Sequence, residues 1–233
     1  ACRRQRQMCI RDSPIDHGDS EHLNEDFFRA TDIQALIEVV KYLGQKFSDN
    51  EIHLIGFSLG GNISLRISAS AEINFLKKTI VLSPVINPEN SMNAMDKNSW
   101  ILRKYFIDKW KKTIRRKIDL YNINAKEALK HKNIKSLTEY FTENFTPHSH
   151  VRDLFSAYAV TQETLNNINH DTFIYSAYDD PCVPIEPLLE LEETTNVEFN
   201  ALEYGGHCGF IDDFRFTSSV YDEISKKLES NTH

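Results

Sequence analysis

The chain has 233 residues, a formal net charge of −7, 40% hydrophobic residues and 26% charged residues. This balance supplies enough apolar material for a packed core and excludes disordered, collagen-like and coiled-coil chains. An acidic chain is also a poor match for a dedicated nucleic-acid-binding domain, and no run of about 18 apolar residues predicts a membrane span. Four cysteines, two of them at positions 2 and 9, do not make a disulfide framework. We therefore expect a reducing, cytoplasmic setting.

The first residues differ in character from the rest of the chain. Residues 1–13 read ACRRQRQMCIRDS, which resembles a translated sequencing-adapter tail. The stretch lacks the apolar block of a secretory signal peptide. We expect residues 1–14 to be either foreign to the protein or a disordered basic tail, and we do not interpret their arginines as a nucleic-acid patch; these are Arg3, Arg4, Arg6 and Arg11.

Hydrophobic periodicity then predicts alternating helices and strands. Residues 15–25 are polar and turn-rich, and the helical spacing over 26–47 predicts an amphipathic helix with Asp26 at its N-cap and Gly44 near its end. The other expected elements are strands at 51–57, 79–82, 172–177 and 197–202, and helices at 59–70, 186–191 and 213–229. Such alternation predicts an α/β fold with a mostly parallel sheet and helices on both faces.

Residues 87–168 have a different composition and interrupt this alternation. Within 103–135, twelve lysines and arginines face three acids, a net charge of +9, and apolar residues recur every four positions from Leu102 to Ile118. We interpret 87–168 as an inserted helical cap on a core formed by 15–86 and 169–233. The basic cap is either a solvated helical face or a surface for peripheral contact with anionic lipid.

Six of the eight glycines lie at two places, and the first surrounds a serine. The sequence Gly56-Phe57-Ser58-Leu59-Gly60-Gly61 follows the strand 51–57 and opens a helix. This is the context of a G-x-S-x-G nucleophile elbow, in which the serine sits on a strained strand-to-helix turn. We expect Gly56 and Gly60 to leave room for that turn, Ser58 to be a nucleophile and the Leu59 N–H to face a developing oxyanion. A phosphate loop is the alternative, but Asn62-Ile63 stands where a Walker loop needs Lys-Ser/Thr.

The second glycine group surrounds a histidine. Gly205-Gly206-His207-Cys208-Gly209 follows the last predicted strand, and a serine hydroxyl needs a base such as His207 within hydrogen-bond reach. We expect His53, inside a strand, to be a satisfied structural residue, and Cys208 to be a packing residue. His148 and His150 lack the third ligand of a catalytic zinc site.

An acid is needed to orient such a histidine. Asp179 and Asp180 end the strand 172–177 in the sequence Tyr-Asp-Asp-Pro-Cys-Val-Pro. We favour Asp180 as the partner of His207, with Asp179 as the alternative, and both could instead cap the helix near Glu186. The chain order Ser58, Asp180, His207 is that of α/β-hydrolases.

Taken together, these motifs resemble the YheT-like esterase and lipase branch of the α/β-hydrolases. The matching pieces are Asp16-His17-Gly18-Asp19-Ser20-Glu21-His22-Leu23-Asn24, His53 to Asn62, Asp179-Asp180-Pro181 and Gly205 to Phe210. The resemblance implies hydrolysis of short- to medium-chain acyl esters or acylglycerols, without a metal or a cofactor. Some relatives are alcohol acyltransferases, which leaves acyl transfer to an alcohol as an alternative.

The resemblance also predicts that the chain is N-terminally truncated. In this branch, the loop beginning Asp16-His17-Gly18 follows the fourth strand of the sheet, and the second oxyanion donor lies on the loop after the third strand. We expect strands 1–4 and that donor to be missing, which leaves strand 51–57 with an open apolar edge. A poorly expressed fragment with little turnover, or a catalytically impaired binding module, is the corresponding expectation for this chain.

Overall fold

A computed structural model describes residue 10, residue 16, residues 20–98 and residues 100–229 of the chain. The predicted tail 1–14, apart from Ile10, lies outside the described residues, and so do His17, Gly18 and Asp19 of the loop that carries part of the resemblance.

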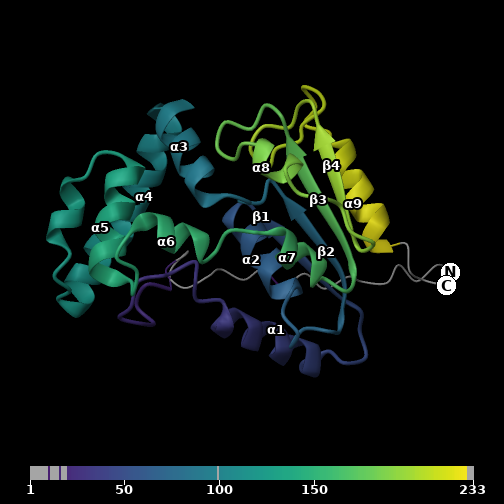
Figure 1. The fold of residues 1–233 in the computed structure, drawn as a ribbon, viewed down its shortest axis with the longest axis horizontal. Coiled ribbons are helices and arrows are strands. Elements are labelled where there is room, and N and C mark those ends of the chain that lie inside the picture. The colour runs from purple at the N-terminus through teal and green to yellow at the C-terminus, as the bar shows by residue number, and fades with distance from the viewer. Residues whose placement is uncertain (1–9, 11–15, 17–19, 99, 230–233) are drawn as a thin grey trace.

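Four parallel strands form the sheet. They are β1 (Ile52–Phe57), β2 (Leu76–Leu82), β3 (Asp171–Ala177) and β4 (Val197–Leu202), and they are hydrogen-bonded in the order β1-β2-β3-β4. All four carboxyl ends therefore point to the same edge of the sheet (Figure 1). The predicted parallel strands are confirmed, and β2 begins three residues earlier than its apolar pattern indicated.

Helices cover both faces of this sheet, as the sequence predicted. On one face α9 (Ser219–Glu229) packs through Val220 and Ile224 against the inward side chains of β2 and β3. On the other face α2 (Leu59–Ser68), α7 (Gln162–Asn166) and α8 (Glu186–Leu189) share one apolar cluster, and α1 (Gln34–Lys46) packs beside α2 (Figure 1). The sheet is thereby the middle layer of three.

Residues 88–156 form a helical unit to one side of the sheet (Figure 1). Its helices are α3 (Pro88–Asn98), α4 (Trp100–Tyr121), the 3₁₀ helix η1 (Lys126–Lys130), α5 (Ile134–Phe145) and α6 (Val151–Ser156). They enclose their own apolar cluster, in which Ile114, Leu137 and Phe141 are buried. Helix α7 falls inside the range expected for the cap but packs with the core cluster through Leu165.

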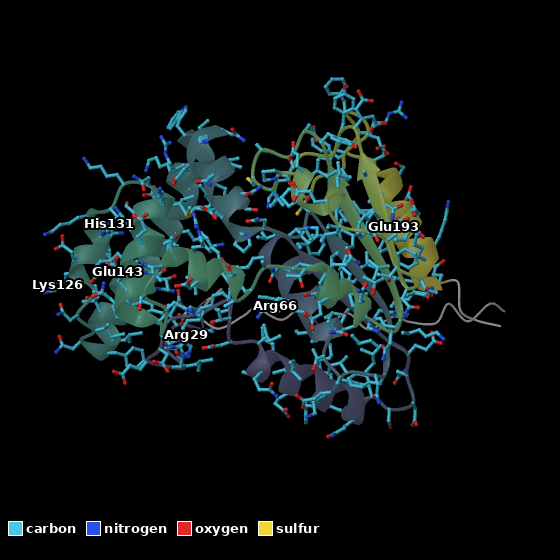
Figure 2. All side chains as sticks on the ribbon, in the orientation of Figure 1. Arg29, Arg66, Lys126, His131, Glu143 and Glu193 are labelled. Atoms are coloured by element: carbon cyan, nitrogen blue, oxygen red, sulfur yellow. The ribbon has the colours of Figure 1, made fainter. Side chains whose placement is uncertain are left out.

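Two helices begin later than predicted, and the first is α1. It starts at Gln34, with Ile33 at its N-cap and no side-chain cap, so Asp26 does not cap it. The guanidinium of Arg66, which is labelled in Figure 2, donates to the carbonyls of Ala30 and Thr31 at 2.6 and 3.3 Å. These carbonyls would accept intrahelical bonds in a helix over 26–47, so a tertiary contact overrides the local pattern.

The predicted closing helix at 213–229 also begins late, at Ser219. The carboxylates of Asp212 and Asp213 accept backbone N–H bonds from Ser219 and Arg215 at 2.5 and 2.8 Å. Aspartate side chains compete for backbone donors in this way and favour turns over helices. Residues 213–218 therefore form the approach to α9 and not its first turns.

One of the cap's cations is not on its surface. Lys117 of α4 is fully buried, and its Nζ lies 2.7 Å from Asp16 Oδ1 and 3.2 Å from the Asn24 carbonyl. Lys117 also donates to the Asp26 carbonyl. This ion pair attaches the segment preceding α1 to the cap. The Lys117 charge, which was counted within the basic cap from the sequence, is therefore buried and does not belong to its solvated face.

Strand β1 lies at the end of the sheet, with β2 as its only strand partner among the described residues. Two of its apolar side chains are partly solvent-exposed, Ile55 at 41% and Phe57 at 46%. Both lie on the sheet face that α9 covers over β2 and β3. Within the described part of the chain, no helix combines the length and hydropathy needed to cross a membrane.

Candidate active site

Ser58 occupies a sharp turn between β1 and α2. Its backbone has φ of 53° and ψ of −121°, a region that non-glycine residues rarely adopt and that costs about 1–3 kcal/mol. The turn is held because the Ser58 N–H donates to the Leu82 carbonyl at 2.9 Å, while its own carbonyl accepts from Gly61 at 2.9 Å. A rigid turn of this kind presents the hydroxyl at the carboxyl edge of the sheet.

The glycines of this turn do not all have the role expected of them. A Cβ at Gly56 would lie 2.4 Å from Ser64 Oγ and 2.5 Å from the Gly60 carbonyl oxygen, so Gly56 is sterically required. A Cβ at Gly60 would meet nothing within 4 Å, and the expectation that Gly60 makes room for the turn is therefore wrong. Gly61 is the second close approach, because its Cβ would lie 2.9 Å from Pro84 Cβ.

His207 lies on the loop after β4, and glycine geometry shapes this loop too. Gly206 has a φ of 55°, and a Cβ at Gly205 would lie 2.5 Å from the Phe210 ring. The Phe210 N–H closes the loop on the Gly205 carbonyl at 2.8 Å, and the Tyr221 hydroxyl of α9 donates to the Cys208 carbonyl at 2.7 Å. The imidazole is thus carried by a loop fixed at both ends.

The two candidate acids have separate contacts. Asp180 is buried, and its Oδ1 accepts the backbone N–H groups of Cys182 and Val183 at 2.8 and 3.0 Å. Its Oδ2 lies 2.9 Å from His207 Nδ1, and Oδ1 lies 3.2 Å from the same nitrogen. Asp179 is exposed, and its Oδ1 accepts the N–H groups of Gly205 and Gly206, each at 2.8 Å. Asp180 contacts the histidine ring, whereas Asp179 holds the backbone of the loop that carries it.

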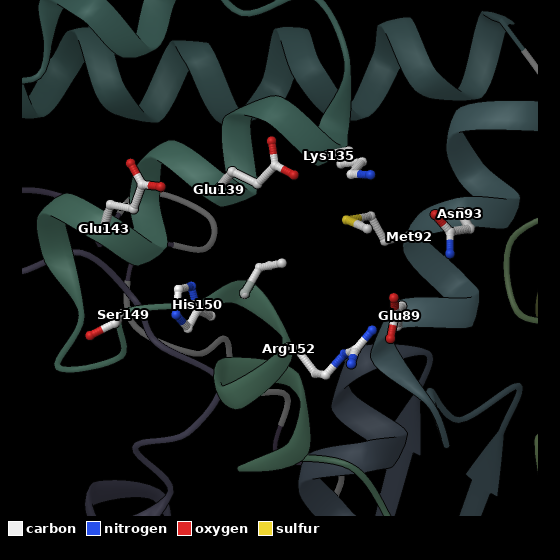
Figure 3. A pocket seen from close by; sticks show the side chains of 10 residues that line it. Glu89, Met92, Asn93, Lys135, Glu139, Glu143, Ser149, His150 and Arg152 are labelled. Carbon is white, nitrogen blue, oxygen red and sulfur yellow. The ribbon is translucent and has the colours of Figure 1, made fainter.

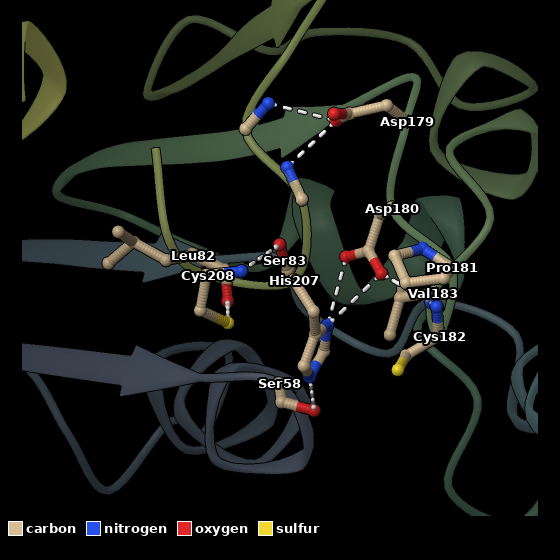
Figure 4. Close-up of polar contacts among 12 residues, drawn as sticks. Ser58, Leu82, Ser83, Asp179, Asp180, Pro181, Cys182, Val183, His207 and Cys208 are labelled. Atoms are coloured by element: carbon tan, nitrogen blue, oxygen red, sulfur yellow. Dashed lines mark hydrogen bonds and ion pairs between the residues drawn. The ribbon is translucent and has the colours of Figure 1, made fainter. Parts of the chain in front are cut away.

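These contacts place three side chains in one hydrogen-bonded line (Figure 4). His207 Nε2 lies 3.0 Å from Ser58 Oγ, and His207 Nδ1 faces Asp180 on the opposite side of the ring. A neutral imidazole that donates from Nδ1 to the carboxylate leaves Nε2 free to accept the serine proton. The arrangement can activate a hydroxyl for attack on an electrophilic carbon.

Leu59, the predicted oxyanion donor, is the first residue of α2. The N–H groups of the first turn have no partner within their own helix, and they lie at the positive end of the helix dipole. The Leu59 N–H, next to Ser58 in the chain, is therefore suited to stabilise a negative charge that develops there.

Two supporting residues of the site were not anticipated. Asn62 of α2 is fully buried, and its Nδ2 donates to the carbonyls of Val85 and Tyr158 at 2.8 Å each. These bonds connect α2 to the segments that enter and leave the helical unit 88–156. Ser83, with φ of 46°, accepts the Cys208 N–H on its Oγ at 3.3 Å. Neither role has a local signal in the sequence, because each depends on carbonyls or amides distant along the chain.

Other residues weighed from the sequence lie away from this line. His53 was expected to be satisfied, but its buried Nδ1 has no hydrogen-bond partner among the described residues, and burial lowers its pKa. Burial raises the pKa of the Cys208 thiol to about 11, which does not suit a reactive thiolate at neutral pH. His150 precedes α6 and lines a cavity of about 410 Å³ within the cap.

That cavity is separate from the serine and histidine. It lies between α3, α5 and α6, and Figure 3 shows Lys135 and Glu139 reaching toward it from α5 and Arg152 from α6. Charges of both signs line it, and Ser58, Asp180 and His207 are not among the lining residues.

The fold and this geometry agree with a comparison to known families. Residues 4–214 match the model of the alpha/beta hydrolase fold family. The chain belongs to the α/β-hydrolase family. The resemblance inferred from its motifs is thereby confirmed at the level of this family.

Curated relatives of this α/β-hydrolase are distant. A putative esterase, YheT, of Escherichia coli is 26% identical over 180 residues, covering 74% of this chain and 52% of that protein. Abhydrolase domain-containing protein 2 of Drosophila melanogaster is 23% identical over 194 residues, covering 74% of this chain and 48% of that protein. The chain spans about half the length of the curated relatives it matches.

Solved structures show the same fold. A serine hydrolase of Cycloclasticus zankles has a TM-score of 0.57 at 16% identity, covering 93% of the present chain and 77% of that chain. A Staphylococcus aureus protein of unknown function has a TM-score of 0.50 at 16% identity, with coverages of 86% and 72%.

Proposed function

We propose that the protein is a serine hydrolase that cleaves carboxylic esters through an acyl-enzyme. In this proposal Ser58 is the nucleophile, His207 the general base and acid, and Asp180 the residue that orients the imidazole. The observation that carries the proposal is the line of contacts at 2.9 and 3.0 Å, built on a strained turn and a buried carboxylate.

The proposed reaction uses these groups in two stages. His207 Nε2 takes the Ser58 proton as Oγ attacks the ester carbonyl, and Asp180 stabilises the imidazolium that forms. The Leu59 N–H binds the tetrahedral oxyanion, and His207 then protonates the leaving alcohol. Water, deprotonated by the same imidazole, attacks the acyl-enzyme and releases the acid and Ser58.

Apolar side chains beside the line support an acyl substrate. Cys182 and Val183 donate their N–H groups to the Asp180 carboxylate. Their side chains cluster with Val85 and with cap residues that are only partly buried: Met95, Leu102 and Phe106. Apolar lining with a few convergent polar groups is typical of small-molecule sites. The esterase name of the Escherichia coli relative agrees with this substrate class.

A covalent probe tests the nucleophile directly. A fluorophosphonate should label the wild-type chain, and Ser58→Ala should abolish the labelling, because among the described residues Ser58 is the hydroxyl that His207 Nε2 contacts. Ser225→Ala, on the exposed side of α9, is the matched control and should label as the wild type does. Labelling that persists in Ser58→Ala would show that the nucleophile is misassigned.

For the partner, we propose that the cap makes peripheral contact with anionic membranes. Trp100 and Ile101 at the start of α4 are 67% and 61% exposed, beside the basic residues of that helix. Exposed aromatic and aliphatic residues next to lysines favour the interface of an anionic bilayer. Co-sedimentation with phosphatidylserine vesicles should decrease in Trp100→Ala but not in Leu120→Ala, at the other end of α4. If the fraction of protein that co-sediments does not depend on the phosphatidylserine content of the vesicles, the proposed contact is refuted.

A further inference from the structure

A thiol lies beside the hydrogen-bonded line, and the proposed reaction does not use it. Cys182, Asp180 and His207 each offer one ligand atom, and these three atoms all lie within 4.8 Å of one another. Cys182 is buried, two residues after Asp180, and its own N–H donates to the Asp180 carboxylate. Figure 4 shows the Cys182 side chain on the Asp180 side of the imidazole.

We propose that Cys182, His207 and Asp180 form a site for a thiophilic divalent cation such as Zn²⁺ or Cd²⁺, and that the bound cation inhibits the enzyme. A thiolate, an imidazole nitrogen and a carboxylate oxygen are the ligand types that zinc prefers, and three protein ligands leave a fourth position open. Metal–ligand bonds of 2.0–2.3 Å place tetrahedral ligands about 3.6 Å apart. The longest separation therefore needs to contract by about 1.2 Å at most, and the 2.9 Å between His207 Nδ1 and Asp180 Oδ2 needs to widen by about 0.7 Å if both atoms bind the cation.

Metal binding at this position is incompatible with base catalysis. A cation on His207 Nδ1 replaces the proton shared with Asp180, so the neutral imidazole carries its proton on Nε2. Nε2 then has no lone pair with which to accept the Ser58 proton. A cation on Nε2 occupies the lone pair that faces Ser58 Oγ at 3.0 Å. Either mode removes the base, and this inhibitory consequence rests on the proposed function, whereas the metal site itself does not.

Binding must release the thiol proton. Burial, reinforced by the negative charge of Asp180, raises the pKa of the Cys182 thiol to about 11. The thiol is therefore protonated at neutral pH, and the cation must displace that proton as the sulfur–metal bond forms.

Cadmium titration of the reduced full chain tests the site without requiring activity, in a Cys2→Ser/Cys9→Ser background that leaves Cys182 and Cys208 as the two thiols. Formation of a cadmium–thiolate bond produces an ultraviolet charge-transfer band, whose growth gives the affinity. Cys182→Ser should abolish the band or weaken binding at least tenfold. Cys208→Ser is the matched control: its thiol donates to the Leu82 carbonyl and has a similarly raised pKa, and it should bind as the wild type does. An unchanged band in Cys182→Ser would overturn the proposal.

A second variant keeps the test decisive if Cys182→Ser does not fold. His207→Asn retains the thiol and the carboxylate but removes the imidazole, and it should also weaken cadmium binding at least tenfold. Binding of wild-type strength in this variant would equally refute the three-residue site.

Fluorophosphonate labelling then separates the two proposals. Zn²⁺ should slow labelling of the wild type at least tenfold, with recovery on adding EDTA, and the ratio of rates with and without Zn²⁺ should approach one in Cys182→Ser. No labelling without metal would refute the proposed function, while the cadmium band still decides the site. Normal labelling without a band would refute the metal site alone, and a band without slowed labelling would refute inhibition.

Discussion

Replacing Asp180 with asparagine is expected to reverse the tautomer of His207. Two backbone donors, from Cys182 and Val183, point at Asp180 Oδ1 at 2.8 and 3.0 Å. An asparagine has only one oxygen, and placing its NH₂ against these donors would leave both unsatisfied, at about 1–3 kcal/mol each. The oxygen therefore keeps the Oδ1 position on the backbone donors, and the NH₂ takes the Oδ2 position, which at 2.9 Å against 3.2 Å is the nearer of the two to His207 Nδ1.

An amide donor at that position requires Nδ1 to accept. The imidazole proton then moves to Nε2, where it faces Ser58 Oγ at 3.0 Å and prevents Nε2 from taking the serine proton. Tautomer inversion of this kind lowers the rate by about 10⁴-fold, which corresponds to about 5 kcal/mol of transition-state stabilisation. We expect Asp180→Asn to show this loss in the rate of fluorophosphonate labelling.

Two measurements check the reasoning, and one does not depend on activity. The ¹⁵N spectrum of His207 should show the proton on Nδ1 in the wild type and on Nε2 in Asp180→Asn. Asp179→Asn is the matched control, because an amide oxygen can still accept the N–H groups of Gly205 and Gly206, and its labelling rate should stay within about tenfold of wild type. A folded Asp180→Asn variant that keeps the Nδ1 proton and labels within tenfold of wild type would refute the assignment.

Three further perturbations test the support of the site and the fold. Gly56→Ala should destabilise the protein by about 1–3 kcal/mol and slow labelling, because the added methyl overlaps backbone. Lys117→Met leaves the buried Asp16 carboxylate with the Phe28 N–H but without its cation, and should cost about 3–5 kcal/mol in urea unfolding. In His170→Gln, the free energy of unfolding should fall less steeply than in the wild type as the pH is lowered. Burial lowers the folded-state pKa of His170, so unfolding takes up a proton as the pH falls below about 6.5.

The glycine and lysine substitutions each have a control in the same chain. Gly60→Ala adds its methyl to open space in a helix and should be neutral or stabilising by up to about 1 kcal/mol. Lys104→Met breaks only an exposed pair with Asp108 and should cost less than about 0.5 kcal/mol. Equal effects within either pair would contradict the steric or the ion-pair argument. An acid profile unchanged by His170→Gln would show that His170 does not contribute to the loss of stability below about pH 6.5.

The sequence by itself determined the elements whose pattern is local. Short apolar runs bounded by turns located the four strands, and period-3.6 patterns located most helices. Glycines beside Ser58 and His207 marked the two turns that need unusual backbone. The chain order of serine, acid and histidine pointed to the α/β-hydrolase family because that order reflects the strand order of its sheet.

Only the tertiary structure decided which groups meet. Asp179 and Asp180 are adjacent and chemically equal, and the hydrogen bonds to residues 182 and 183 direct one of them toward His207. The burial of Lys117, the open space at Gly60 and the late start of α1 likewise depend on partners far along the chain. A local pattern encodes the periodicity of an element, whereas these contacts depend on distances that exist only once the elements have packed.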